Sequence, residues 1–308
     1  MIEIKLGDAR HLDTVLDPES VALSIWSPPY HVGKEYEQDQ SFIEWKSLLR
    51  RTLASHSVVL KKGGFVAVNI ADILCFEDDT LPRIMAENVT RRRRADITRD
   101  AILKVQSQHP DWGRQQIAKE LGCSEQTVDR RLKGNNIRGG KYAIQTRVLL
   151  AGPLLEQAAI DVGLVLYDRR IWQKDPAWVN SRWHTMSYRA IDEFEYVYIF
   201  WKPGPTIVDK SRLSRDEWVE WGSRGVWHIP SVRSNDDHVA KFPIELPRRL
   251  IQLFSGAGDL VIDPFVGSGT TALAALGEGR DFIGIDKEAK YVTMARNAVS
   301  QYSTRYVS

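Results

Sequence analysis

A short proline turn contains the residues with the clearest chemical purpose in this sequence. The tetrapeptide Ser27-Pro28-Pro29-Tyr30 follows an apolar run at 21–26, which is typical of a buried strand. Prolines fix their own φ and donate no backbone hydrogen bond, so the pair forms a rigid corner. There the Ser27 hydroxyl and the Pro28 carbonyl can accept N–H bonds, while the Tyr30 ring can stack. The turn suits a planar heterocycle with an exocyclic amine; an ordinary proline turn is the alternative.

A glycine-rich turn near residue 267 is the second segment whose residues could form a functional site. Residues 260–271 have the pattern of a strand that runs into a glycine-rich turn, and an alanine-rich helix follows at 272–276. A second strand at 281–286 ends in Asp286. In such nucleotide-binding units glycines let the backbone approach the ligand, and the acid meets ribose hydroxyls. Neither the Gly-x-Gly-x-x-Gly pattern of dinucleotide sites nor the phosphate-loop pattern is present. The turn predicts a ligand with a ribose but no phosphate.

Together, the two segments resemble the motifs of the DNA amino-methyltransferases, which use S-adenosylmethionine to methylate N4 of cytosine or N6 of adenine. The second motif is Asp263-Pro264-Phe265-Val266-Gly267-Ser268-Gly269-Thr270-Thr271. The catalytic motif precedes the cofactor motif, as in the β, or circularly permuted, arrangement of that family. The resemblance extends over most of the chain and includes His238-Val239-Ala240-Lys241-Phe242-Pro243.

The resemblance implies a role for each motif. It implies that residues 27–30 hold a target base flipped out of the duplex and that its amine attacks the methyl group directly, so positioning is the main demand. Asp286 would meet the cofactor ribose and Asp8 its adenine, although Asp8 could equally belong to a plain Gly-Asp turn. The other implied cofactor-binding residues are Asp263, Pro264, Phe265, Gly267, Ser268, Gly269, Thr270 and Thr271, with Lys241, Phe242 and Pro243 closing over them.

The first residue of the proline turn bears on the acceptor base. Serine there resembles the N4-cytosine branch, whereas the N6-adenine branch usually has Asp or Asn; N6-adenine remains the alternative. Methylation of cytosine carbon 5 is disfavoured, because the family resemblance would place its thiolate in a Pro-Cys pair, and Cys75 and Cys123 both lack a preceding proline. These cysteines form neither a metal-ligand pattern nor a disulfide framework. An RNA or protein methyltransferase and a non-catalytic DNA-binding regulator remain competing hypotheses.

The rest of the chain predicts an α/β fold in two blocks, 1–77 and 142–308. Strands are expected near 2–6, 21–26, 65–70, 165–172 and 195–202, and helices near 42–60, 148–162 and 290–299. This alternation indicates a Rossmann-like, mostly parallel sheet with helices on both faces. The blocks together form the expected methyltransferase domain.

Residues 91–138 form an insert of a different kind. Residues 91–141 contain 13 Lys and Arg against 6 Asp and Glu, whereas the whole chain has a net charge of only +2. Residues 114–132 resemble a helix-turn-helix, and a helix near 98–108 would complete a three-helix core. Its second helix would enter the major groove, with Glu125, Gln126 and Arg130 as candidate base readers. The candidate phosphate contacts are Arg91, Arg92, Arg93, Arg94, Arg114, Arg131 and Lys133. A solvated basic face or a dimerisation module is the alternative.

Residues 204–237 are a second candidate for target recognition, because tryptophans and arginines alternate there. In β-order relatives, the recognition segment precedes the motif that ends in Lys241-Phe242-Pro243. The alternative is that Trp218, Trp221 and Trp227 belong to the core and the arginines to the surface.

Composition supports a soluble protein: 43% of the 308 residues are hydrophobic, and 27% are charged. No apolar run has transmembrane length, and no signal peptide is expected. We expect a cytoplasmic, nucleoid-associated protein of a prokaryote or phage, monomeric or homodimeric, that binds double-stranded DNA. A cognate restriction endonuclease is an optional partner.

Overall fold

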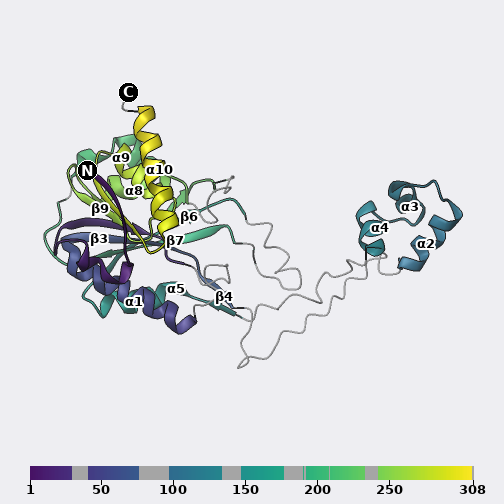
Figure 1. Ribbon diagram of the computed structural model, residues 1–308, viewed down its shortest axis with the longest axis horizontal. Helices are drawn as coiled ribbons and strands as arrows, with labels where there is room; N and C mark the ends of the chain where they lie inside the picture. Colours follow the sequence, from purple (N-terminus) through teal and green to yellow (C-terminus); the bar gives the residue numbers. More distant parts are fainter. Residues whose placement is uncertain are drawn as a thin grey trace. The chain divides into compact units, whose positions relative to one another are not determined.

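The computed structural model describes residues 1–29, 41–75, 97–133, 147–176, 190, 192–207, 209–232 and 242–306. It divides the chain into two compact units. The larger comprises 1–75, 147–176 and 192–308, and the smaller comprises 76–146 and 177–191. In Figure 1, the strands and most helices belong to the larger unit, and α2, α3 and α4 belong to the smaller one.

An eight-stranded sheet in the order β1-β10-β9-β2-β3-β7-β6-β8 organises the larger unit. Its strands are β1 (Ile2–Leu6), β2 (Val21–Trp26), β3 (Leu60–Ile70), β6 (Val165–Gln173), β7 (Phe194–Trp201), β8 (Val226–His228), β9 (Leu260–Asp263) and β10 (Asp281–Asp286). The first five in spatial order are parallel, and β7 is antiparallel to both β3 and β6. All six residues of β2 are buried, as expected for a central strand covered on both faces. The mostly parallel sheet is therefore confirmed.

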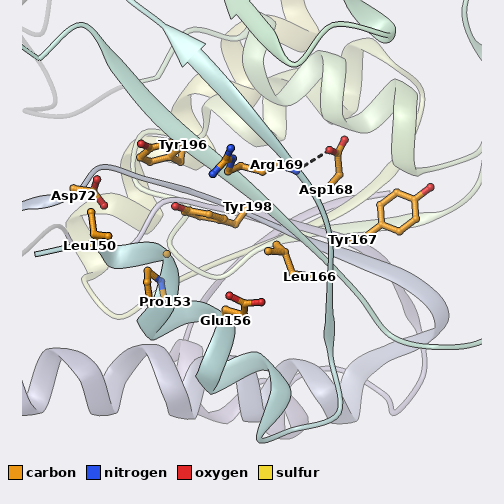
Figure 2. A pocket seen from close by; sticks show the side chains of 11 residues that line it. Asp72, Leu150, Pro153, Glu156, Leu166, Tyr167, Asp168, Arg169, Tyr196 and Tyr198 are labelled. Atoms are coloured by element: carbon orange, nitrogen blue, oxygen red, sulfur yellow. Dashed lines mark hydrogen bonds between the residues drawn. The ribbon is translucent and has the colours of Figure 1, made fainter.

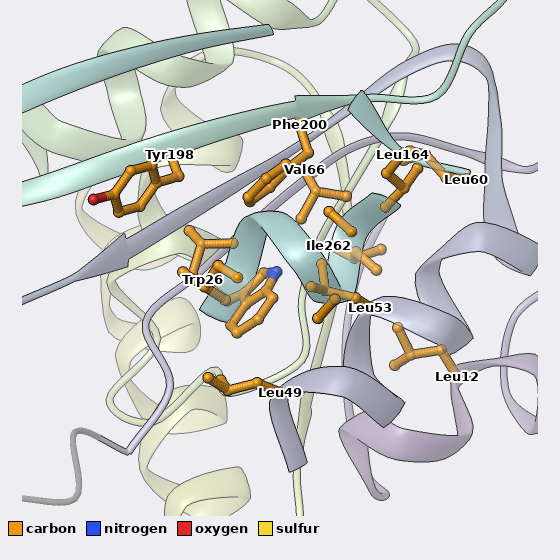
Figure 3. Close-up of a cluster of buried hydrophobic side chains, with 14 of the residues drawn as sticks. Leu12, Trp26, Leu49, Leu53, Leu60, Val66, Leu164, Tyr198, Phe200 and Ile262 are labelled. Carbon is orange, nitrogen blue, oxygen red and sulfur yellow. The ribbon is translucent and has the colours of Figure 1, made fainter. Parts of the chain in front are cut away.

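Helices cover both faces of this sheet (Figure 1). One face packs against η1 (Ala9–Thr14), α1 (Phe42–Val59) and α5 (Ala151–Ile160), and the other against α8 (Glu245–Phe254), α9 (Thr270–Gly277) and α10 (Ala289–Tyr306). Figure 3 shows the first of these cores, where the Trp26 indole lies between Val66 of β3 and the leucines of α1, Leu49 and Leu53. None of the described helices is long and apolar enough to cross a membrane.

Two expected boundaries differ in the structure. β3 begins at Leu60, not at 65, because Leu60 already pairs with Val21. The pairing of β2 with β3 shifts register between Val21 and Leu23, which accommodates the additional residues of β3. The helix expected from 148 begins at Ala151, because β5 (Arg147–Leu149) pairs with β4 (Ile73–Cys75) in a separate two-stranded sheet.

The segment from 204 to 232 also contains short elements that the sequence pattern does not reveal. They are η5 (Lys210–Arg212), α7 (Arg215–Glu217), the π-helix η6 (Trp218–Gly222) and β8.

The smaller unit contains α2 (Arg99–Gln108), α3 (Arg114–Glu120) and α4 (Glu125–Leu132). Thr98 caps α2 by accepting the Ala101 N–H at 3.1 Å, and Gly122, with φ +61°, makes the turn between α3 and α4. The three helices share a small core of Ile97, Ile102, Val105, Ile117, Ala118 and Val128.

Candidate active site

Four parallel strands end next to one another at one edge of the sheet. The strands lie in the order β1-β10-β9-β2. Asp8 follows β1, Asp286 and Asp263 are the last residues of β10 and β9, and Ser27 follows β2. Ligands of open α/β sheets bind outside the carboxyl ends of the strands. The fold therefore brings to one edge predicted site residues that lie more than 250 positions apart in the sequence.

The proline turn continues directly from β2. Ser27 and Pro29 are half-buried, and Pro28 is buried. The Pro29 carbonyl accepts a hydrogen bond from the indole Nε1 of Trp45 at 2.6 Å. Trp45 lies in the first turn of α1 and is fully buried, but its sequence pattern indicates only a core position. Tyr30, the fourth residue of the predicted catalytic turn, lies outside the described residues.

A buried histidine supports β2 beneath this turn. His56 Nδ1 lies 2.7 Å from the Thr52 carbonyl oxygen, so that nitrogen carries the proton, and Nε2 accepts the Ser24 hydroxyl at 2.7 Å. The ring stacks on Trp26 with centroids 5.7 Å apart. Burial lowers the pKa of His56 to about 4. This neutral histidine is a structural support, and sequence alone gives no signal for it.

Asp263, the first residue of the cofactor motif, is buried behind the glycine turn. Its Oδ2 accepts the Thr271 hydroxyl at 2.5 Å, and its Oδ1 accepts the Phe265 backbone N–H at 3.0 Å. Burial raises the pKa of Asp263 to about 7, and the Thr271 hydrogen bond opposes this shift. Asp263 therefore braces the turn from inside the protein.

The turn itself requires its glycines. Gly267 and Gly269 have φ of +51° and +88°, which are values that L side chains rarely adopt. A Cβ on Gly269 would also lie 3.1 Å from the Cα and Cβ of Ala295 in α10. The backbone of this turn is thus folded tightly against the C-terminal helix, as a site for a closely approaching ligand needs.

Asp286 closes the other side of the turn at the end of β10. Its Oδ2 accepts the Gly267 N–H at 3.1 Å, and its Oδ1 accepts the Glu288 N–H at 3.0 Å. Burial raises the pKa of Asp286. Each carboxylate oxygen has two lone-pair directions, so both retain acceptor capacity for ribose hydroxyls. The residues present therefore fit a cofactor that contains a ribose.

The remaining predicted cofactor residues surround this centre. Pro264 is buried, and Ser268 and Thr270 are half-buried with their hydroxyls 3.4 Å apart. Asp8 caps η1, and the Arg10 guanidinium beside it lowers the pKa of Asp8 to about 2. The contacts of Asp8 with η1 and Arg10 are therefore also those expected of a plain Gly-Asp turn, the alternative that the sequence left open.

The segment expected to close over the cofactor is described only in part. Phe242 packs against the hydrophobic core that α8, α9 and α10 cover, and the Pro243 carbonyl accepts the Leu246 N–H at 3.0 Å. Lys241 lies outside the described residues.

A separate hollow of about 610 Å³ lies beside α5 (Figure 2). Tyr196 and Tyr198 of β7 and Arg169 of β6 line it, together with Asp72 and Glu156. None of the predicted catalytic or cofactor residues contributes to its lining, so we do not assign it to the active site.

The predicted DNA-reading residues lie on the outer side of α4. Glu125, Gln126 and Arg130 are exposed. The Asp129 carboxylate lies 2.6 Å from Arg114 Nη1 and 2.9 Å from Lys133 Nζ, so two of the predicted phosphate contacts have an acidic neighbour. Arg131 is half-buried, and Arg91, Arg92, Arg93 and Arg94 lie outside the described residues.

The three tryptophans of the segment 204–232 differ in their exposure to solvent. Trp221 and Trp227 are buried with ring centroids 6.2 Å apart, whereas Trp218 is 53% exposed. Arg249 of α8 lies over both buried rings. Two of the three tryptophans thus belong to the core, and Trp218 is the one available to a partner.

Comparison with known proteins gives the class that this site and fold define. The DNA methylase family, which comprises N6 and N4 methyltransferases, matches residues 21–297. The chain belongs to this family, and it is therefore a DNA methyltransferase whose cofactor is S-adenosylmethionine. The type II methyltransferase M.BglI of Bacillus subtilis is 57% identical over 296 residues, which are 96% of this chain and 85% of M.BglI.

Solved structures support the fold. TTHA0409 of Thermus thermophilus, solved with S-adenosyl-L-methionine, has a TM-score of 0.63 at 21% identity and covers 98% of this chain and 94% of its own. The cytosine-N4-specific PvuII DNA methyltransferase has a TM-score of 0.60 at 18% identity, with coverage of 99% and 92%.

Proposed function

We propose that this methyltransferase modifies N4 of cytosine in duplex DNA, using a flipped base and direct in-line transfer in the β, permuted, arrangement. S-adenosylmethionine supplies an electrophilic methyl group on its sulfonium. The Ser27 hydroxyl and the Pro28 carbonyl accept the two amine hydrogens, and the Tyr30 ring stacks on the base. This directs the amine nitrogen toward the methyl group. As the new N–C bond forms, the C–S bond of the sulfonium would break and S-adenosylhomocysteine would leave. The methylated nitrogen is acidic, so it loses its proton without a strong base.

The observation that carries the proposal is the shared edge of the sheet. The proline turn follows β2, and the glycine turn follows β9, its immediate neighbour in the sheet. A base held by Ser27 and a cofactor held by the glycine turn and Asp286 therefore meet at adjacent strand ends. Such proximity is what a direct transfer between two bound substrates demands.

The choice of cytosine depends on Ser27. At 18% identity, the similarity to the cytosine-N4-specific PvuII enzyme supports the fold alone. The serine at this position resembles the motif of the N4-cytosine branch. N6-methyladenine is the alternative product. We further infer that the exposed face of α4 contributes to site recognition and that Trp218 is available for DNA contact. A restriction endonuclease of the same specificity is a proposed partner.

Methyl incorporation tests the substrate class. The full-length protein is incubated with S-adenosylmethionine carrying a labelled methyl group and, in parallel, with duplex DNA, RNA or protein from a host that lacks the enzyme. We expect label in duplex DNA only, and a strongly reduced rate of labelling with Ser27→Ala. Label confined to RNA or protein would reject the proposed substrate.

A further inference from the structure

The proline turn has one backbone torsion that its own residues leave unrestrained. The pyrrolidine rings fix φ of Pro28 and Pro29, and a following proline restricts ψ of Ser27 and Pro28 to the extended region. No proline follows Pro29, so its ψ is the soft torsion at the point where the chain continues to Tyr30. This torsion sets the direction of the Pro29 carbonyl and of the peptide group that leads to the stacking residue.

Trp45 engages this same carbonyl. Its indole N–H donates to the Pro29 oxygen at 2.6 Å, and the indole is fully buried. The Phe42 ring stacks beside it with centroids 5.7 Å apart at 19°. The donor therefore has little freedom to follow a moving carbonyl.

The start of α1 fixes the position of the indole. Ser41 and Glu44 form a reciprocal capping box: the Glu44 N–H donates to Ser41 Oγ at 3.2 Å, and the Ser41 N–H donates to Glu44 Oε2 at 2.8 Å. Because Trp45 follows Glu44 directly, the cap and the indole share one rigid helical turn.

We propose that Trp45 is a positioning residue for methyl transfer: its indole N–H locks ψ of Pro29 and thereby the geometry of the base-holding turn. Trp45 bonds the carbonyl of the second proline, so the Pro28 carbonyl keeps its proposed role as acceptor for the substrate amine. The inference rests on the proposed methyl transfer at this site. It assigns to Trp45 an effect on the rate of the chemical step and none on cofactor binding.

The test is Trp45→Phe, which keeps an aromatic ring and removes the N–H. The matched control is Trp201→Phe, which removes an indole bond to Thr206 Oγ1 of 2.9 Å at the last residue of β7, where Trp201 pairs with Phe65 in the middle of β3. With DNA and cofactor saturating, Trp45→Phe should slow single-turnover methylation on the order of 10- to 100-fold. The KM for DNA and the calorimetric Kd for S-adenosylmethionine should stay within about twofold. Trp201→Phe should keep the rate.

Each outcome separates the inference from the proposed function. An inactive wild-type protein would contradict the function itself. An active wild type with a Trp45→Phe variant that is equally fast per folded molecule would overturn the positioning role. If Trp45→Phe does not fold, replacement of Trp45 by 3-benzothienylalanine keeps the volume of the indole and removes only the donor. That variant must show the same loss of rate at unchanged cofactor affinity, or the inference is wrong.

Discussion

The rings of Trp26 and Phe265 lie 5.4 Å apart, tilted by 37°, and join the two turns of the site. Trp26 is the last residue of β2, directly before Ser27, and Phe265 belongs to the cofactor motif. A displacement of either ring is therefore transmitted to the other turn. We predict from this contact that the proposed base and cofactor sites depend on one another.

Phe265→Ala should weaken cofactor binding and slow methyl transfer together. Loss of an aromatic pair removes about 0.5–1.5 kcal/mol beyond the lost buried area, and here the loss affects both turns. Calorimetry and single-turnover kinetics measure the two effects. Phe254→Ala is a suitable control, because its ring centroid lies 4.9 Å from that of Phe65 in β3, a residue that belongs to neither turn of the site. It should lower stability only; equal effects of both variants on transfer would disprove the coupling.

Ser27→Ala should slow transfer strongly while leaving cofactor affinity unchanged, because Ser27 is proposed to contact the base and not the sulfonium. Removing one positioning acceptor typically lowers the rate by on the order of 10²-fold or more. Rates of methyl incorporation and the calorimetric Kd for S-adenosylmethionine are the two readouts. A near-normal rate would remove Ser27 from the catalytic residues.

The pKa shifts of Asp263 and His56 predict opposite effects of pH on stability. The pKa of Asp263 is raised from 3.8 to about 7, so its contribution to stability is lost as pH rises from about 4 to 7. The pKa of His56 is lowered from 6.5 to about 4, so its contribution is lost as pH falls from about 6.5 to 4. Between about pH 4 and 6.5 the two contributions cancel in the wild type.

A variant that lacks one of the two groups should therefore show a pH dependence of the free energy of unfolding that is absent from the wild type. Relative to wild type, cofactor-free Asp263→Asn should lose stability as pH falls from 6.5 to 4, by about 1.4 kcal/mol per pH unit. His56→Gln should lose stability as pH rises over the same window. Urea unfolding at several pH values measures the free energies. Parallel curves for both variants and the wild type would show that neither shift exists.

Arg130→Ala should reduce discrimination between target sites. Arg130 is exposed in the last turn of α4, the helix proposed to enter the major groove. Loss of a base contact should cost about 1–3 kcal/mol at one position of the site and relax specificity there. Arg99→Ala, on the exposed start of α2, is the matched control. If the two variants bind cognate and altered sites alike, α4 does not read the bases.

Local pattern was sufficient to predict most of the fold. The buried run of β2, the amphipathic α1 and the strand-turn-helix around Gly267 each carry their signal within about twenty residues. Contacts that cross the sequence could not be predicted in this way. The Trp45–Pro29 and His56–Ser24 hydrogen bonds depend on how α1 docks against β2, which no periodicity specifies.

Short elements were also hidden from pattern reasoning. Strands β4, β5 and β8 contain three residues each, too few to show an alternation, and their pairing depends on neighbours distant in the chain. The burial of Trp221 and Trp227 likewise follows from packing against α8 and not from their spacing.

Nucleoside analysis of the product tests the central claim most directly. Duplex DNA methylated by the full-length protein in vitro is digested to nucleosides, and these are separated and identified by mass spectrometry. The account predicts N4-methylcytosine as the only new nucleoside, formed much more slowly with Ser27→Ala. N6-methyladenine as the sole product would contradict the assignment of the acceptor base, and 5-methylcytosine would contradict direct transfer to an exocyclic amine.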